Sequence, residues 1–229
     1  MSITSIHAEL EQVFIKLELA SARSVCVSAV KGGAGATSLA SALVERYLFA
    51  GYKTLLVDFN LFNPSFSPLP LPSQGNEQPL IVRDETKQVF CGIASPKERS
   101  LQMLYRDPNS LKQRVAQWSQ EYDRIVFDTC ALNDTSQFTI PTASIAHVTD
   151  ATLLVVSGGE TTEEELKAAI EQLQTTDASI VGIILNQHNQ SQLADELVRV
   201  ADKAQLLTPS FKQRIKNWLR RTSLFRQAV

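Results

Sequence analysis

The segment that most constrains the fold runs from Val25 to Ser38 and reads VCVSAVKGGAGATS. It passes from an apolar, strand-like run through three glycines into a pattern typical of an α-helix. Glycines allow consecutive backbone N–H groups to converge on an anion, and a helix N-terminus adds a partial positive charge. We therefore expect a phosphate-binding loop here. The alternative is an ordinary glycine turn, which fits poorly with a lysine before the glycines and a threonine after them.

The rest of the chain alternates short apolar runs with helical patterns, which is typical of a parallel sheet with crossover helices. The runs are apolar almost throughout, as expected when helices cover both faces of a sheet. The sequence thus predicts an α/β fold, a three-layer sandwich whose mostly parallel sheet has helices on both faces. The expected strands are Ser24–Ala29, Lys53–Asp58, Arg124–Asp128, Ala151–Val156 and Ser179–Leu185, with Val89–Ala94 as a weaker candidate.

Helices are expected at residues 1–20, after the glycine loop as far as Gly51, at residues 109–120, and from Thr161 or Thr162 onward. Each of these two threonines has a glutamate three residues later, which is a capping box. Residues 66–79 contain four prolines and predict an exposed, fairly stiff loop. The expected organisation is a leading helix at 1–20, a main domain at 21–205 and a C-terminal helix at 206–229.

Composition agrees with one globular domain, because 229 residues with 44% hydrophobic content can bury a full core. The three cysteines, Cys26, Cys91 and Cys130, lie in or beside apolar runs without CxxC spacing, so we expect buried free thiols. We see no secretion-signal pattern at the N-terminus, and the strongest apolar run, Ala151–Val156, is too short to span a bilayer. These features predict a cytoplasmic protein.

The net charge of −2 argues against nucleic-acid binding as the main activity, yet residues 203–229 hold seven basic residues and no acidic ones. Within 209–229, one helical stripe is apolar and basic residues fill the remainder. The stripe consists of Phe211, Ile215, Trp218, Leu219 and Phe225. This pattern predicts a basic amphipathic helix that binds the inner-membrane surface or a membrane protein. The alternative is a terminal helix that packs its stripe on the domain.

The loop resembles the deviant Walker A motif of the MinD/ParA group of P-loop NTPases, Lys-Gly-Gly-x-Gly-Lys-[Ser/Thr]. The resemblance implies that Lys31 reaches the nucleotide of a partner subunit across a homodimer, and that Thr37 binds Mg²⁺. It also implies that ATP or ADP is held by Gly32, Gly33, Ala34, Gly35, Ala36, Thr37 and Ser38. The second lysine of the motif is Ala36 here, and losing such a charge commonly costs ~10²–10³ in rate. We therefore expect nucleotide binding with weak or absent hydrolysis.

Three further segments carry the resemblance. LLVDFNLFNPS, residues 55–65, resembles the family's second acidic motif, with Asp58 at its first aspartate and Asn60 at its second. YDRIVFDT, residues 122–129, resembles the Walker B strand and implies that Asp128 supports Mg²⁺ together with Thr37 and Asp58. GIILNQ, residues 182–187, implies that Asn186 contacts adenine. Asp58 is the implied catalytic carboxylate beside Lys31. The alternative for Asp58 is a simple strand-end cap, and an aspartate at a strand end such as Asp128 is common in itself.

The resemblance covers roughly residues 8–190 and is divided between two branches. The cytoplasmic domains of bacterial tyrosine kinases that partner polysaccharide export share the Asn-Pro-Ser ending and the VTDATLLVVSGGETT stretch. The pilus-assembly proteins TadZ and CpaE share the replaced P-loop lysine. The chain has four tyrosines and none of them lies in residues 203–229, so tyrosine kinase activity is not expected. We expect a non-kinase relative, peripheral at the inner membrane, that organises polysaccharide synthesis or export. A pilus-assembly localisation factor and a scaffold that binds no nucleotide are the alternatives.

Overall fold

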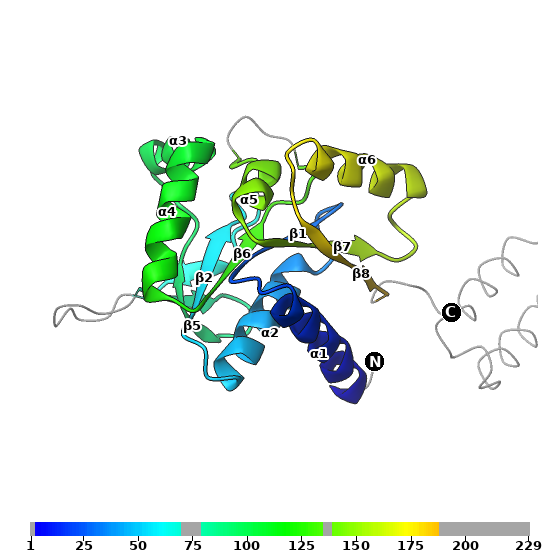
Figure 1. Cartoon of the computed structure of the whole chain (residues 1–229), viewed down its shortest axis with the longest axis horizontal. Coiled ribbons are helices and arrows are strands. Elements are labelled where there is room, and N and C mark those ends of the chain that lie inside the picture. The colour runs from blue at the N-terminus through cyan, green and yellow to red at the C-terminus, as the bar shows by residue number, and fades with distance from the viewer. Residues whose placement is uncertain (1–2, 70–78, 135–138, 188–229) are drawn as a thin grey trace, which may run out of the picture. The chain divides into compact units, whose positions relative to one another are not determined.

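A computed structural model describes residues 3–69, 79–134 and 139–187. The chain forms two compact units, of which the first comprises Met1–Ser157 and Thr161–Asn186 and the second Gly158–Glu160 and Gln187–Val229. Every helix and strand of the described residues belongs to the first unit, which is drawn in colour in Figure 1. The C-terminal helix predicted at 206–229 lies outside the described residues.

An eight-stranded sheet, in the order β3-β4-β5-β2-β6-β1-β7-β8, forms the centre of the first unit. Neighbours from β5 to β8 pair in parallel, whereas β3 and β4 pair antiparallel at one edge. The strands are β1 Ser24–Ala29, β2 Thr54–Phe59, β3 Phe66–Pro68, β4 Leu80–Arg83, β5 Val89–Ile93, β6 Arg124–Thr129, β7 Ala151–Ser157 and β8 Ile180–Asn186. The predicted mostly parallel sheet is confirmed, and each predicted strand lies within a residue of its observed bounds.

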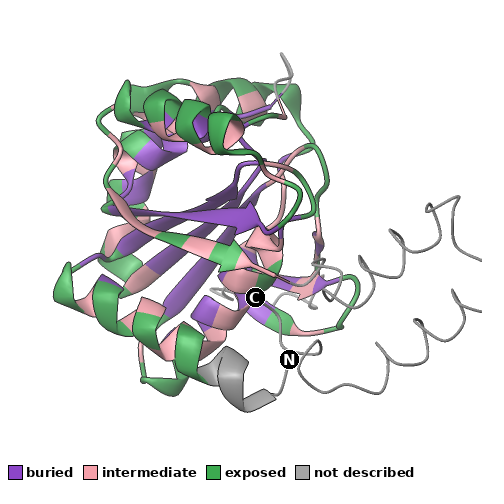
Figure 2. Cartoon of the chain, turned by 90° about the vertical axis from the view of Figure 1, so that its right-hand side faces the viewer, coloured by how far each residue is buried: buried purple, intermediate pink, exposed green. Residues whose placement is uncertain are grey.

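Helices cover both faces of this sheet, as Figure 1 shows, so the predicted three-layer sandwich is also confirmed. On one face α1 and α2 pack against alternate residues of the strands, such as Val25 and Val27 of β1. On the other face α3 to α6 pack against the intervening residues, such as Cys26. The helices are α1 Ile3–Leu19, α2 Ala36–Phe49, α3 Arg99–Arg106, α4 Pro108–Glu121, α5 Thr142–Val148 and α6 Glu163–Gln174. Figure 2 shows the buried strands between two layers of helices with exposed outer faces.

The leading helix α1 is an integral part of this unit. Leu17 is fully buried in the core, and both carboxylate oxygens of Glu18 accept hydrogen bonds from Arg124 at 2.8 and 2.9 Å. Nearer its start, Glu11 accepts two hydrogen bonds from Arg46 of α2, at 2.6 and 2.8 Å. These contacts hold α1 against α2 and the start of β6.

The proline-rich segment differs from the prediction of an exposed loop at 66–79. Phe66, Ser67 and Pro68 form β3, and Phe66 is buried edge-on against Phe90 with ring centroids 6.0 Å apart. Pro68 is tolerated because β3 is the last strand of the sheet, where one backbone N–H needs no partner strand. Residues 70–78 lie outside the described residues.

The cysteines are free thiols, as expected, although Cys91 is only partly buried. Burial raises the pKa of Cys26 to about 12, so this thiol is unreactive at neutral pH. Among the described helices, none is long and apolar enough to cross a membrane.

Candidate phosphate-binding site

The glycine loop follows β1, a central strand of the parallel sheet, and ends where α2 begins. Gly33 and Gly35 have φ angles of 81° and 98°, in the left-handed region that costs residues with a Cβ about 1–2 kcal/mol. Gly35 is the N-cap of α2 and has no side chain that could accept a hydrogen bond from the first N–H groups of the helix. The loop therefore presents backbone donors and the positive end of a helix at one place, which suits an anion.

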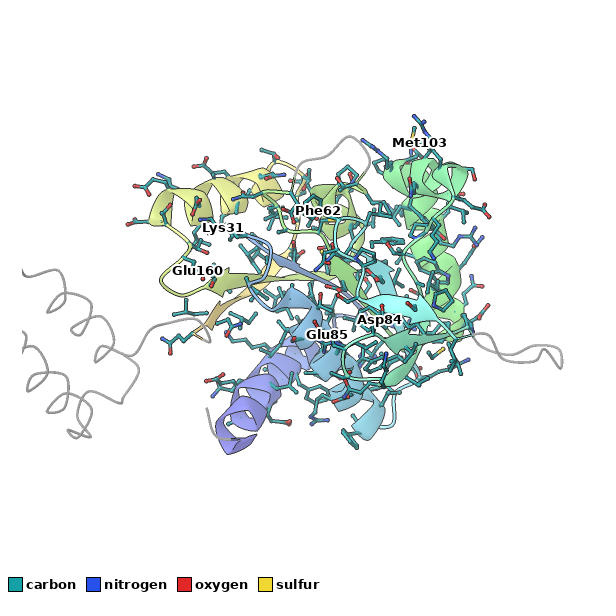
Figure 3. The ribbon with its side chains drawn as sticks, turned by 180° about the vertical axis from the view of Figure 1, so that it is seen from behind. Lys31, Phe62, Asp84, Glu85, Met103 and Glu160 are labelled. Carbon is teal, nitrogen blue, oxygen red and sulfur yellow. The ribbon has the colours of Figure 1, made fainter. Side chains whose placement is uncertain are left out.

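A cavity of about 490 Å³ opens along this loop. Its walls come from the loop and from the segments that follow β2, β4 and β6, which meet at the carboxyl ends of the parallel strands, where ligands bind in open α/β sheets. Figure 3 labels Lys31, Phe62 and Glu85, one from each of three of these segments. The lining residues are Ala29, Lys31, Gly32, Gly33, Ala34, Gly35, Ala36, Thr37, Ser38, Asn60, Phe62, Asn63, Ser65, Arg83, Glu85, Thr129, Ala131 and Asp134.

Two buried carboxylates lie side by side at the strand ends. Asp58 of β2 and Asp128 of β6 are partners in the parallel register, and both residues are fully buried. Asp58 Oδ1 accepts a hydrogen bond from the Asn60 N–H at 2.9 Å, while Asp58 Oδ2 and both oxygens of Asp128 have no hydrogen-bond partner. Buried carboxylate oxygens without donors are costly unless a cation joins them.

The raised pKa values of Asp58 and Asp128 agree with a site that lacks a compensating positive charge. Burial raises the pKa of Asp58 to about 7, and burial together with the charge of Asp58 raises the pKa of Asp128 to about 8. The Thr37 hydroxyl and the Arg83 guanidinium act in the opposite direction on Asp128, although Thr37 does not reach hydrogen-bonding geometry with either oxygen. A hydroxyl and two carboxylates are oxygen ligands of the kind that Mg²⁺ takes, so these residues fit the predicted ion.

No group of three or more His, Cys, Asp or Glu side chains is positioned to hold a metal ion within the part of the chain that the structure describes. A magnesium ion at Thr37, Asp58 and Asp128 would therefore depend on other oxygen ligands, such as phosphates and water, to complete its shell.

Asn60 replaces the second aspartate of the acidic motif, and its side chain has a local role. Its Oδ1 accepts the N–H of Asn63 at 3.0 Å, while its own N–H binds Asp58. The side-chain amide of Asn60 thus holds the turn after β2, and its backbone N–H keeps Asp58 in place.

Asn186 ends β8 and lies against the glycine loop. Its Nδ2 donates to the carbonyl of Ala34 at 2.8 Å, and a Cβ added to Gly35 would lie 2.7 Å from that same nitrogen. The structure therefore gives Asn186 a contact that positions the loop, and the contact with adenine stays a prediction.

Lys31 lines the cavity and its ammonium points to the start of α6. Lys31 Nζ lies 2.8 Å from Glu165 Oε2, and hydrogen bonding to Lys31 holds the pKa of Glu165 below its usual range. Glu165 also completes the predicted capping box, in which Thr162 is the N-cap. The role of Lys31 across a dimer stays a prediction.

Arg83 is the one residue of the cavity wall that brings a buried charge and that the sequence did not identify. It ends β4, is 9% exposed, and donates to the hydroxyls of Ser38 and Ser41 at 3.0 and 3.3 Å. Nothing in the local sequence marks it, because β4 belongs to an antiparallel edge that matches none of the motifs.

Comparison with curated proteins by sequence finds similarity to tyrosine-protein kinases. No family model matches the chain. The tyrosine-protein kinase YwqD of Bacillus subtilis is 25% identical over 177 residues, which cover 72% of this chain and 72% of that protein.

Among solved structures, the kinase domain of the Escherichia coli tyrosine kinase ETK has a TM-score of 0.56 at 17% identity, covering 74% of this chain and 69% of that one. Cobyrinic acid a,c-diamide synthase from Mycobacterium smegmatis, with bound ADP and magnesium, has a TM-score of 0.53 at 16% identity and covers 89% and 94% of the two chains. The chain is thus similar in sequence to bacterial tyrosine-protein kinases and has the mostly parallel α/β fold of the P-loop NTPases.

Proposed function

We propose that the protein binds ATP or ADP with Mg²⁺ in the cavity at the start of α2. One observation carries this proposal: the left-handed glycine loop opens beside Asp58 and Asp128, and three of their four carboxylate oxygens are buried without a hydrogen-bond partner. The loop would hold the phosphates through backbone N–H groups, and Thr37 with the two carboxylates would hold the ion. The synthase with bound ADP and magnesium, which shares the fold, supports the choice of ligand.

Hydrolysis is proposed to be weak or absent, for two reasons that lie in the loop and the acidic motif. Ala36 carries no charge to stabilise a transferring phosphoryl group. Asn60 cannot act as a base, and its side chain is engaged in the turn after β2. The nucleotide therefore acts as a ligand that sets the state of the protein.

Tyrosine autophosphorylation is not part of the proposal. All four tyrosines lie within the described residues. Three of them, Tyr47, Tyr105 and Tyr122, are buried, and the hydroxyl of Tyr52 donates to Glu18 at 2.9 Å. None of these four hydroxyls lies on an exposed segment that the active site of a second molecule could reach.

We propose further that the nucleotide promotes a homodimer with Lys31 at the shared face, and that this dimer organises polysaccharide synthesis or export at the inner membrane. The similarity to bacterial tyrosine-protein kinases supports the envelope role. Residues 209–229 would attach the dimer to an anionic membrane surface or a membrane protein, and no nucleic-acid partner is expected.

Isothermal titration of the full chain with ATP and with ADP, each with and without Mg²⁺, tests the binding proposal. Micromolar binding that needs Mg²⁺ and is weakened by Asp128→Asn supports it, with Glu121→Gln at the exposed end of α4 as the charge-matched control. Absence of binding at millimolar nucleotide would identify a nucleotide-free scaffold instead. Phosphate release is expected at background, and brisk turnover that Asp58→Ala abolishes would refute impaired hydrolysis.

A further inference from the structure

Arg83 is a buried cation whose neighbours are mostly neutral. Its Nη2 donates to Ser38 Oγ at 3.0 Å and its Nη1 to Ser41 Oγ at 3.3 Å, and both serines belong to α2. A buried guanidinium ordinarily meets a carboxylate or a phosphate, because two neutral hydroxyls do not balance its charge.

The charge of Arg83 is only partly compensated among the described residues, because it acts on Asp128 through space without a hydrogen bond to either Asp128 oxygen. Its Nε is buried and has no hydrogen-bond partner. Its ion-pair partner, Glu85, is 80% exposed, and Glu85 Oε2 lies 3.5 Å from Nη2, so water screens this pair. The N-terminus of α2 next to Ser38 carries a partial positive charge that repels a cation. A buried arginine in this position is costly until an anion joins it.

The residues that line the cavity indicate which kind of anion would fit. Arg83 and Ala36 line the same space, together with the glycines that present backbone N–H groups. Ala36 occupies the position of the lysine that the motif would aim at the terminal phosphates, and Ser38, which contacts the guanidinium, lies two residues later in the first turn of α2.

We propose that Arg83, from β4, supplies the positive charge for the terminal phosphates of a nucleoside polyphosphate that the loop lacks at Ala36. This inference rests on the proposed nucleotide site and adds the residue that makes the site selective for diphosphates and triphosphates over monophosphates. A planar guanidinium can bind two phosphate oxygens at once, so an arginine on β4 can take the role of the lysine that the loop lacks.

The first test is affinity, measured by isothermal titration of the full chain with ADP, a non-hydrolysable ATP analogue and AMP, all with Mg²⁺. Arg83→Gln keeps a donor for Ser38 but removes the charge, so affinity for ADP and for the analogue should fall about 10- to 100-fold. Affinity for AMP should change little. Lys87→Gln, an exposed position in the same turn after β4, removes the same charge elsewhere and should change none of the three.

The second test separates a phosphate contact from a structural role. Ala36→Lys restores a cation beside the same phosphates, so it should recover most of the affinity lost in Arg83→Gln and add less to the wild type. Without nucleotide, Arg83→Met should unfold at the same temperature as the wild type or higher, because a buried and poorly paired charge has been replaced by an apolar chain. Its rise in unfolding temperature with Mg²⁺ and ADP should be smaller than that of the wild type.

The outcomes distinguish the two proposals. If wild type binds ADP and Arg83→Gln binds it equally well, Arg83 is not a phosphate ligand and the nucleotide site stands. Equal losses for AMP and ADP, or no recovery with Ala36→Lys, would make Arg83 a structural residue. If wild type binds none of the three nucleotides, the proposed function and the role of Arg83 are both wrong.

Discussion

Lys31 Nζ and Glu165 Oε2 lie 2.8 Å apart, so the lysine of the glycine loop is held by the first turn of α6 within one chain. The same carboxylate oxygen accepts the N–H of Thr162 at 2.9 Å and so completes the helix cap. A lysine that serves a partner subunit has to leave this pair, which makes the ion pair a competitor of the proposed dimer.

Glu165→Gln is therefore expected to favour the dimer, because glutamine keeps the capping box but releases the charge of Lys31. Lys31→Ala should abolish the dimer in either background. Light scattering with Mg²⁺ and nucleotide, at tens of micromolar protein as befits weak association, measures both effects. Glu163→Gln, an exposed acidic residue in the same turn, is the control. The dimer proposal fails if wild type and Lys31→Ala stay monomeric with nucleotide.

Two of the left-handed glycines, Gly35 and Gly51, offer a matched test of the loop. Their φ angles are 98° and 86°, so alanine at either position should cost about 1–2 kcal/mol of stability. A Cβ at Gly35 would in addition lie 2.7 Å from Asn186 Nδ2 and disturb the loop, whereas at Gly51 it meets nothing within 4 Å. Gly35→Ala should thus lose nucleotide affinity in a titration, and Gly51→Ala should not. Equal affinities for the two variants would show that the loop does not hold the nucleotide.

The parallel part of the fold could be predicted because each of its strands is a continuous apolar run that needs helices on both faces. The antiparallel edge, formed by β3 and β4, could not be predicted from the sequence. β3 has three residues, two of which are Ser67 and Pro68, and its burial depends on the contact of Phe66 with Phe90, which no local pattern specifies. α3 was missed for a similar reason, since RSLQMLYR is short and only Tyr105 is buried.

The residues of the site also divide into those that the sequence predicts and those that it does not. The glycine loop was found from its glycines between a strand and a helix, and Asp58 and Asp128 were found from the resemblance of their segments to the acidic and Walker B motifs. Arg83 was not found, because its place in the cavity depends on the antiparallel pairing of β4 with β3 and β5, and such tertiary pairing leaves no characteristic spacing in the sequence. Asn186 was identified from its motif, but its contact with the Ala34 carbonyl could only be seen in the structure.

Residues 209–229 carry a prediction that depends on sequence alone, since they lie outside the described residues. Basic residues near an anionic surface contribute about 1 kcal/mol each, so the seven from Lys203 onward, with the apolar stripe, suffice for reversible attachment. Full-length protein should sediment with anionic vesicles, less so at high salt, and not with neutral ones. Trp218→Glu should abolish sedimentation while leaving nucleotide affinity unchanged. Unchanged vesicle binding by this variant would assign the stripe to the domain.

The paired carboxylates predict how stability depends on pH when no Mg²⁺ is present. Asp58 and Asp128 have pKa values of about 7 and about 8 in the folded protein, against 3.8 for an ordinary aspartate, so the folded state binds protons more tightly than the unfolded state. Their contribution to the free energy of unfolding is fully present below about pH 4 and is lost as the pH rises through 7 and 8. The loss is up to about 1.4 kcal/mol per pH unit for each group.

Asp128→Asn should remove much of this dependence, because an amide in the same place stays neutral at every pH. The variant should be more stable than wild type at pH 8 and similar to it at pH 4, as measured by urea unfolding at a series of pH values. Asp58 and the other carboxylates are present in both proteins, so the difference between the two curves isolates Asp128 and its interaction with Asp58. Mg²⁺ with nucleotide should raise the stability of wild type most at pH 8, where both carboxylates are ionised, and should do little for Asp128→Asn. A difference between the proteins that grows as the pH falls would mean that the pair is ionised in the apo protein and held by protein donors, and the site would then have no need of a cation.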